Sequence, residues 1–282
     1  MEIPIKQSGN FSLPILGLGT WTMGGKWERN PHNDGARDIN TIREAIELGI
    51  THIDAAESYA AGRAEELVGQ AIGDADRENL FITTKVAKWH LAYDDVIEAC
   101  KNSLERLNTN YVDLYLVHAP NPQIPLKDTT QAMEFLLENE MIRNIGVSNF
   151  TKDLIEEAQS YTNYKIVNNQ IYYNLGIRGH EVQGTLEYCQ KNDILVTAYR
   201  PIEKGEFIEN ELLKELGLKY NKTPLQVALN WVMGKPNMVT LVKTSSSKHL
   251  EEDLGAIGWE LSKEDEERLN KDFPWKDQIE IE

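Results

Sequence analysis

Eight short apolar runs recur along the chain, and a stretch with the spacing of an amphipathic helix follows each of them. Most of the runs have no polar face, which is typical of parallel strands that are buried on both sides. Strands and helices alternating in this number predict an α/β fold, the (β/α)8 TIM barrel. The apolar runs cover residues 16–20, 52–55, 80–85, 112–118, 144–147, 166–171, 195–199 and 239–242.

The segments around these runs complete the predicted fold. An N-terminal β-hairpin is expected around residues 8–10, where Gly9 supplies the turn. Residues 202–210 read as a loop, and the tail after Asp265 is short and charged. We therefore expect one barrel domain over residues 1–282, with extra helices near the C-terminus. Helices are predicted at 36–49, 64–73, 93–108, 129–140, 152–161, 181–192, 211–221, 224–234 and 248–257.

A doubly wound sheet is the main alternative fold, because such sheets carry a Gly-rich fingerprint after an early strand. Residues 17–25 read GLGTWTMGG and do contain glycines. They do not form a GxGxxG motif that opens a helix, since a loop continues through residues 26–35. The barrel is therefore the preferred interpretation.

The charge of the chain restricts its partners. The formal net charge is -16, and an acidic surface disfavours both non-specific nucleic-acid binding and attraction to anionic membranes. Any phosphate-bearing ligand must therefore be held by local basic groups and backbone amides.

Cysteine usage and the N-terminal sequence bear on the compartment. The two cysteines, Cys100 and Cys189, fall inside predicted helices and read as free thiols, with no metal-ligand spacing. The first residues show no basic region followed by an apolar stretch, and no run reaches the length of a membrane span. We expect a soluble, cytoplasmic protein without a metal.

Four polar residues follow three successive apolar runs. Asp54 and Tyr59 come from THIDAAESY (51–59), Lys85 from LFITTK (80–85), and His118 from VDLYLVH (112–118). The carboxyl ends of barrel strands meet at one face, where active sites are built. Each residue alone is more often structural, but together they predict a proton-donating site around a tyrosine.

An ordered set of motifs runs over nearly the whole length of the chain. The motifs are GLGTW (17–21), THIDAAESY (51–59), TTK (83–85), DLYLVH (113–118), GVSNF (146–150), NNQIYYN (168–174), AYRP (198–201) and VKTSSSKHLEED (242–253). With these motifs in this order, the sequence resembles the aldo-keto reductases, which implies a (β/α)8 barrel that reduces carbonyl groups with NAD(P)H. The resemblance implies that Tyr59 is the general acid, that Lys85 and Asp54 tune it, and that His118 helps to position the carbonyl.

The chemistry of these side chains agrees with that role. Hydride addition to a carbonyl leaves an alkoxide, which needs an aimed proton donor. A phenol with a pKa of about 10 is a poor donor at neutral pH, and a nearby ammonium lowers that pKa. We therefore expect Lys85 to lower the pKa of Tyr59, with Asp54 as the counter-charge of Lys85.

A second set of residues would hold the cofactor. Hydroxyl and amide groups after two later strands suit a nicotinamide carboxamide, and Tyr199 could stack on its ring. The run of residues 243–247 suits an anion, because hydroxyls, amides and a helix N-terminus meet there. The resulting cofactor set is Thr20, Ser148, Asn149, Gln170, Tyr199, Arg200, Lys243, Thr244, Ser245, His249, Glu252 and Asp253.

Some of these positions depart from the common pattern of the family. His249 stands where an Arg often grips the adenosine 2′-phosphate, and Asp253 where an Asn often meets the adenine. A neutral His lacks the bidentate fork of Arg, so we expect NADPH use with weaker discrimination against NADH than an Arg would give. Arg200 follows the stacking Tyr and would contact either the pyrophosphate or a surface acid.

The substrate pocket is expected to be open and aromatic. Trp21 and Trp89 would line it, with Trp27, Tyr93 and His90 as further candidates, and the short C-terminal segment would leave it permissive. Small carbonyl compounds are the expected substrates of a monomer or weak homo-oligomer. Two alternatives stay open, a non-catalytic NAD(P)-binding barrel that acts as a sensor or regulatory subunit, and a Schiff-base lyase that uses Lys85.

Overall fold

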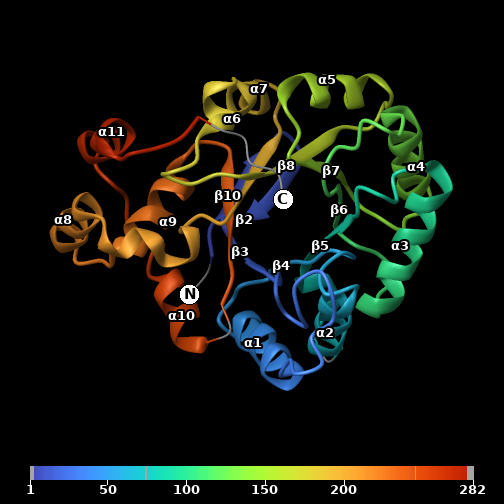
Figure 1. Cartoon of the computed structure of the whole chain (residues 1–282), viewed down its shortest axis with the longest axis horizontal. Helices are drawn as coiled ribbons and strands as arrows, with labels where there is room; N and C mark the ends of the chain where they lie inside the picture. The colour runs from blue at the N-terminus through green and yellow to red at the C-terminus, as the bar shows by residue number, and fades with distance from the viewer. Residues whose placement is uncertain (1–2, 74, 245, 278–282) are drawn as a thin grey trace.

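Parallel strands form a closed barrel at the centre of the chain (Figure 1). The computed structural model describes residues 3–73, 75–244 and 246–277. The strands neighbour one another in the order β10-β3-β4-β5-β6-β7-β8-β9, which confirms the predicted (β/α)8 architecture. Their bounds are β3 (Leu16–Gly19), β4 (His52–Asp54), β5 (Phe81–Val86), β6 (Leu114–Val117), β7 (Ile145–Ser148), β8 (Ile166–Tyr172), β9 (Leu195–Tyr199) and β10 (Met238–Val242).

The predicted hairpin closes the N-terminal end of the barrel. Strands β1 (Ile5–Ser8) and β2 (Phe11–Pro14) pair in antiparallel fashion, and Gly9 has a φ of +58° in the turn between them. Phe11 and Leu13 are buried against apolar side chains of β6, β8, β9 and β10. The hairpin therefore fills the barrel at the end where the strands begin, and the opposite end stays available for a site.

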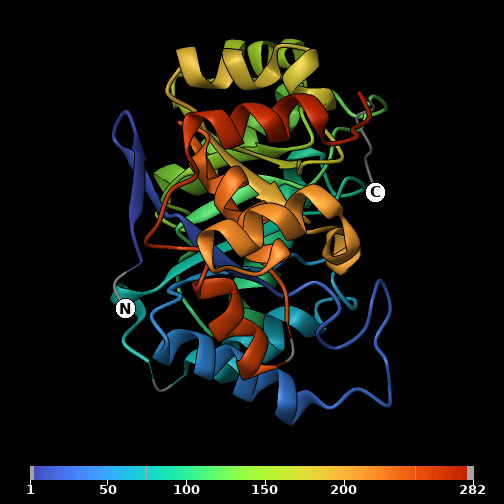
Figure 2. The same ribbon diagram turned by 90° about the vertical axis from the view of Figure 1, so that its left-hand side faces the viewer.

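The helices surround the strands, and Figures 1 and 2 show them as an outer layer around the barrel. Most of these helices bury an apolar face in the hydrophobic core, which agrees with the amphipathic spacing in the sequence. The helices that match the predictions are α1 (Gly35–Glu47), α2 (Arg63–Ile72), α3 (Tyr93–Leu107), α4 (Leu126–Glu138), α5 (Lys152–Ser160), α8 (Glu211–Tyr220), α9 (Pro224–Gly234) and α10 (Ser247–Leu254).

Three predictions of local structure need correction. The helix expected at 181–192 is two helices, α6 (Gly179–Val182) and α7 (Thr185–Lys191), because Gly184 between them has a φ of +75°. The loop expected at 202–210 contains a 3-10 helix, η2 (Glu203–Glu209). The charged tail contains α11 (Lys263–Asp272), which is capped by the Ser262 side chain. A shorter 3-10 helix, η1 (Arg77–Asn79), precedes β5.

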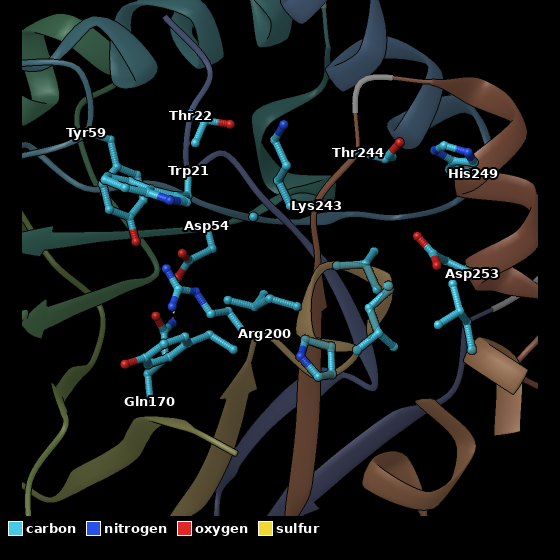
Figure 3. A pocket seen from close by; sticks show the side chains of 18 of the residues that line it. Trp21, Thr22, Asp54, Tyr59, Gln170, Arg200, Lys243, Thr244, His249 and Asp253 are labelled. Atoms are coloured by element: carbon cyan, nitrogen blue, oxygen red, sulfur yellow. Dashed lines mark hydrogen bonds between the residues drawn. The ribbon is translucent and has the colours of Figure 1, made fainter. Parts of the chain in front are cut away.

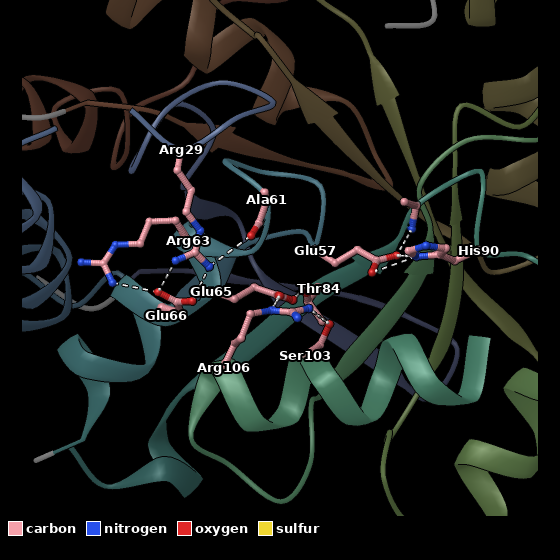
Figure 4. Close-up of polar contacts among 11 residues, drawn as sticks. Arg29, Glu57, Ala61, Arg63, Glu65, Glu66, Thr84, His90, Ser103 and Arg106 are labelled. Carbon is pink, nitrogen blue, oxygen red and sulfur yellow. Dashed lines mark hydrogen bonds and ion pairs between the residues drawn. The ribbon is translucent and has the colours of Figure 1, made fainter. Parts of the chain in front are cut away.

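A buried acid joins two helices to the strand that carries Lys85. Glu65 on α2 is fully buried and accepts hydrogen bonds from Thr84 on β5 at 2.5 Å and from Arg106 on α3 at 2.7 Å (Figure 4). A buried carboxylate is stable only when it is paired and hydrogen-bonded in this way. The network holds β5 in place next to Lys85.

Two buried histidines make the fold sensitive to acid. His52 on β4 and His180 on α6 are each 1% exposed, and burial lowers their pKa values to about 3 and about 4. Neither ring nitrogen of His180 has a partner among the described residues. In the unfolded chain these histidines have pKa values of about 6.5. Below that pH the unfolded chain therefore binds more protons than the folded chain does, and the free energy of unfolding falls as the pH falls.

We expect each of these histidines to cost at most about 2 kcal/mol of unfolding free energy between pH 7 and pH 5. Urea unfolding at the two pH values measures the loss. His180→Leu removes one such group, so its loss of unfolding free energy between pH 7 and pH 5 should be smaller than that of the wild type by up to about 2 kcal/mol. An unchanged pH dependence in this variant would show that His180 is protonated in the fold.

Candidate active site

The ends of β4, β5 and β6 bring the four predicted catalytic residues together. Asp54 is the last residue of β4, Lys85 is the penultimate residue of β5, and His118 directly follows β6. Tyr59 lies in the turn between β4 and α2 and is 9% exposed. The rings of Tyr59 and His118 meet edge to face, with centroids 5.5 Å apart.

The turn that carries Tyr59 has unusual backbone geometry. Ala60 and Ala61 have φ values of +51° and +48°, a region that residues with a side chain rarely adopt. Their backbone amides donate to the carbonyl oxygens of Lys26 and Trp27, at 2.5 and 2.9 Å. Such strain persists only where the surroundings hold it, and here the 26–27 segment fixes the place of Tyr59.

Lys85 uses all three of its N–H bonds within the site. Its Nζ donates to Asp54 Oδ1 at 2.5 Å, to the Ala55 carbonyl at 2.7 Å and to Tyr59 Oη at 3.2 Å. An ammonium has no acceptor, so the Tyr59 oxygen must accept this bond. The proton of Tyr59 is thereby left to point to another acceptor, such as one in the adjoining pocket.

The protonation of this group differs in one respect from the sequence prediction. Burial disfavours the ammonium of Lys85, but Asp54 and Tyr59 together outweigh burial and leave the pKa of Lys85 above its ordinary value. For Tyr59, burial raises the pKa, and the charge of Lys85 offsets this rise only in part. Lys85 therefore lowers the pKa of Tyr59, as expected, but desolvation outweighs this effect and the net pKa stays above its ordinary value.

A cavity of about 820 Å³ opens above these residues, and it brings the catalytic and the cofactor predictions together. Figure 3 shows Tyr59 and Trp21 at one side of this main pocket and His249 and Asp253 at the other. Lys85 is fully buried and does not line it. The predicted residues that line it are Trp21, Asp54, Tyr59, His118, Ser148, Asn149, Gln170, Tyr199, Arg200, Lys243, Thr244, His249, Glu252 and Asp253.

Amide side chains from β7 and β8 connect the pocket wall to the acid site. Gln170 donates to Asp54 Oδ2 at 2.7 Å, so it shares the carboxylate with Lys85. Asn149, with a φ of +61°, donates to Ser148 Oγ and accepts from Tyr199 Oη at 3.0 Å. The Tyr199 ring stacks on Tyr172, with an interplanar angle of 16°. This wall is polar and held in place before any ligand binds.

Arg200 has a conformation that bears on its role. Its φ is +54°, and its guanidinium lies 5.5 Å from the centre of the Tyr172 ring. Its charge is near enough to Tyr59 to favour the phenolate. The side chain therefore contributes positive charge to the pocket, close to the catalytic end.

The opposite end of the pocket carries groups of both signs. Thr244 is buried, and its Oγ1 accepts from the backbone amide of Ser246 at 3.0 Å, while Lys243 is exposed at the rim. His249 on α10 is exposed. Asp253 is 5% exposed, and burial together with Glu252 raises its pKa to about 7. The predicted Ser245 lies outside the described residues.

Two of the predicted pocket residues lie elsewhere. Thr20 is fully buried and does not line the main pocket, because its hydroxyl donates to the Asp54 carbonyl at 3.0 Å. Tyr93, at the start of α3, packs against Phe135, with ring centroids 6.5 Å apart. It lines neither the main pocket nor its neighbour.

A second cavity of about 460 Å³ adjoins the main pocket and shares Trp27 and His118 with it. Trp89 and His90 line this second cavity. Nδ1 of His90 lies 3.1 Å from Glu57, which also accepts from the backbone of Ala87 (Figure 4). The predicted aromatic wall is thus divided between two connected spaces.

Several lining residues were not predicted. Most of those outside the barrel strands come from three segments that are far apart in the sequence, the loop after β3, the η2 segment and the start of α9. The only clue in the sequence was that loops after barrel strands build the site. These residues are Thr22, Ile202, Gly205, Ile208, Thr223, Pro224 and Leu225.

The described residues contain neither a cluster of potential metal ligands nor a helix that could cross a membrane. No group of three or more His, Cys, Asp or Glu side chains among residues 3–73, 75–244 and 246–277 could hold a metal ion. In the same ranges, none of the helices has the length and hydrophobicity that a membrane crossing requires. Cys100 and Cys189 are both free and buried.

Comparisons with known proteins agree with this geometry. A model of the Aldo/keto reductase family matches residues 15–271. Methylglyoxal reductase YeaE of Escherichia coli (strain K12) is 36% identical over 276 residues, which cover 96% of this chain and 94% of that protein.

Two solved structures are similar over almost the whole chain. The thermostable aldo-keto reductase Tm1743, in complex with the inhibitor epalrestat, has a TM-score of 0.92 at 41% identity and covers 95% of this chain and 99% of its own. An aldo/keto reductase from Klebsiella pneumoniae, in complex with NADP and acetate, has a TM-score of 0.87 at 31% identity, with coverage of 100% and 99%.

Proposed function

The chain belongs to the aldo/keto reductase family, and on that premise we propose which of its residues carry out the reaction. It is an oxidoreductase that reduces aldehydes or ketones to alcohols with a hydride from NAD(P)H. The assignment of roles depends on one observation above all. The Lys85 ammonium donates to Tyr59 Oη at 3.2 Å, which leaves the Tyr59 proton free for the substrate.

Tyr59 is the general acid of this proposal. Its pKa lies above its ordinary value, so the phenol is protonated at neutral pH. An alkoxide that develops on the substrate is more basic than a phenolate and would take the proton from Tyr59 Oη. The ammonium of Lys85 then stabilises the phenolate, and Asp54 keeps Lys85 charged.

His118 acts as a neutral hydrogen-bonding group. Burial, with the charges of Lys85 and Lys88, lowers the pKa of His118 to about 3. At neutral pH it therefore carries one ring proton and no charge. It can donate a hydrogen bond to the same carbonyl oxygen that Tyr59 protonates, and this would orient the carbonyl.

The residues of the main pocket fit a nicotinamide dinucleotide, because amide and hydroxyl groups lie at the catalytic end and a lysine at the far end. When bound, NADPH supplies the hydride. Ser148, Asn149 and Gln170 would hold the carboxamide by donor and acceptor bonds. Tyr199 would stack on the ring, and Arg200 would contact the pyrophosphate.

The far end of the pocket would bind the adenosine part. Lys243 and Thr244 offer a cation and a hydroxyl to a 2′-phosphate. Asp253, with a pKa of about 7, is partly protonated at neutral pH and therefore repels a phosphate less than a full carboxylate would. His249 supplies no bidentate contact, so the preference for NADPH over NADH should be modest.

We expect wild-type enzyme to oxidise both NADPH and NADH with a small aldehyde, with the higher kcat/KM for NADPH. His249→Arg should raise the NADPH preference by about tenfold or more, because a charged bidentate contact to phosphate is added. Absorbance of the reduced cofactor follows both reactions, and Lys248→Arg is the control for a guanidinium placed at a neighbouring position without a change of net charge.

The outcome also tests the proposed function. Cofactor binding without turnover, across a panel of aldehydes and ketones that includes methylglyoxal, would favour the sensor alternative. Borohydride trapping of a substrate adduct on Lys85 would instead favour the lyase. Equal kcat/KM values for NADH and NADPH in the wild type would show that Lys243 and Thr244 do not grip a 2′-phosphate.

The substrate class follows from the walls of the pocket. Trp21 and Trp27 lie 4.6 Å apart between ring centroids, and Trp21 also meets Tyr59 at 5.0 Å, so small carbonyl compounds would be held beside the acid. A relative of this chain is a methylglyoxal reductase, which agrees with a small substrate. The single-domain organisation, the monomeric or weakly oligomeric state and the cytoplasmic location stay predictions from the sequence.

A further inference from the structure

The residue before the proposed acid contacts His118. Ser58 Oγ lies 3.2 Å from His118 Nδ1, and Ser58 is 7% exposed. Both residues line the second cavity, and His118 lines the main pocket as well. His118 therefore stands between the two spaces, with Nδ1 turned to Ser58.

The direction of this hydrogen bond decides what His118 can do. A neutral imidazole carries one proton, either on Nδ1 or on Nε2. With the proton on Nδ1, the ring donates to Ser58 and Nε2 is only an acceptor. With the proton on Nε2, the Ser58 hydroxyl donates to Nδ1, and Nε2 can donate to a carbonyl oxygen or to an alkoxide.

We propose that Ser58 is a positioning residue whose hydroxyl donates to His118 Nδ1 and so keeps the ring proton on Nε2, where the substrate oxygen needs it. The inference rests on the proposed function, in which His118 donates to the carbonyl. A serine hydroxyl suits this task because it can rotate to donate, and Ser58 Oγ has no other hydrogen-bond partner among the described residues.

The place of Ser58 in the chain adds a second argument. Ser58 and Tyr59 are adjacent in the turn that the 26–27 segment holds. The same turn therefore fixes the position of Tyr59 directly and, through Ser58, the ring proton of His118. These are the two groups that would donate to the substrate oxygen. Without the hydroxyl, water from the second cavity could reach Nδ1 and either donate or accept, which would leave the ring proton undetermined.

Thr and Val have the same shape, so they form a matched pair at position 58. Ser58→Thr keeps a hydroxyl, and we expect its kcat/KM for a carbonyl substrate to exceed that of Ser58→Val by about fivefold to tenfold, the worth of one hydrogen bond. The Kd of NADPH should be the same in both variants. Equal kcat/KM values for Thr and Val would overturn the proposal.

A double-mutant cycle separates positioning from mere packing. In a His118→Ala background, the ratio of Ser58→Thr to Ser58→Val should fall to about one, because the group that Ser58 acts through is gone. A ratio that persists in this background would show that Ser58 only supports the turn, and would overturn the proposal.

The tautomer can be read without any activity. Nitrogen NMR of the His118 ring should show an unprotonated Nδ1 in the wild type and in Ser58→Thr, and a mixed population in Ser58→Val. A protonated Nδ1 in the wild type would overturn the inference. If the enzyme reduced no carbonyl, the proposed function would fail, and this spectrum would still decide whether Ser58 donates to His118.

Discussion

Replacing Tyr59 with Phe should lower kcat by about a hundredfold or more, and it should leave the Kd of NADPH close to the wild-type value. Phe keeps the ring that packs against Trp21 and His118, at centroid distances of 5.0 and 5.5 Å, but it lacks the oxygen. In this variant, Lys85 no longer has a protonated oxygen beside it that could pass a proton to the substrate. Stopped-flow or steady-state oxidation of NADPH with an aldehyde measures the loss.

Tyr115→Phe is the matched control for this experiment. Tyr115 on β6 is fully buried outside the pocket, and its hydroxyl has no partner among the described residues. The control variant should therefore keep its kcat, which shows that loss of a buried tyrosine oxygen is harmless elsewhere. If Tyr59→Phe kept kcat within about threefold of the wild type, the proton would have to come from another donor.

The fold followed from the sequence because strands that are buried on both sides leave apolar runs. The observed strands β3 to β10 lie within about two residues of the predicted runs at most of their ends. The predictions of helices failed where a single residue or a weak apolar pattern determines the local structure. Gly184 divides a helix whose flanking pattern is continuous. Helix α11 was missed because it buries few side chains, Leu269 among them, so it has little apolar periodicity.

The catalytic residues could be predicted for a related reason. Barrel strands deliver their C-terminal residues to one face, so Asp54, Lys85 and His118 had to meet there. The bond between Gln170 and Asp54 spans 116 residues and left no local trace in the sequence. The effect of Lys85 on the pKa of Tyr59 was predicted in the right direction, but the larger opposing effect of burial could not be, because the degree of burial depends on the whole pocket wall.

Replacing Lys85 with Met should impair both activity and stability. The phenolate of Tyr59 would lose its ammonium, so we expect kcat to fall by about a hundredfold or more. Asp54, whose pKa burial raises even beside Lys85, would lose its counter-charge in a site where it is 2% exposed, with Gln170 as its remaining donor. Breaking a buried pair in this way should cost about 3–5 kcal/mol of unfolding free energy, measured by urea denaturation.

The double variant Lys85→Met/Asp54→Asn separates the two effects. Asn removes the stranded charge and can still accept from Gln170, so much of the lost unfolding free energy should return. The kcat should stay low, because the double variant also lacks the ammonium that donates to Tyr59. Recovery of kcat together with stability would show that Lys85 serves only to balance Asp54. Equal unfolding free energies of the single and double variants would show instead that Asp54 takes up a proton when Lys85 is absent, so that no charge is left stranded.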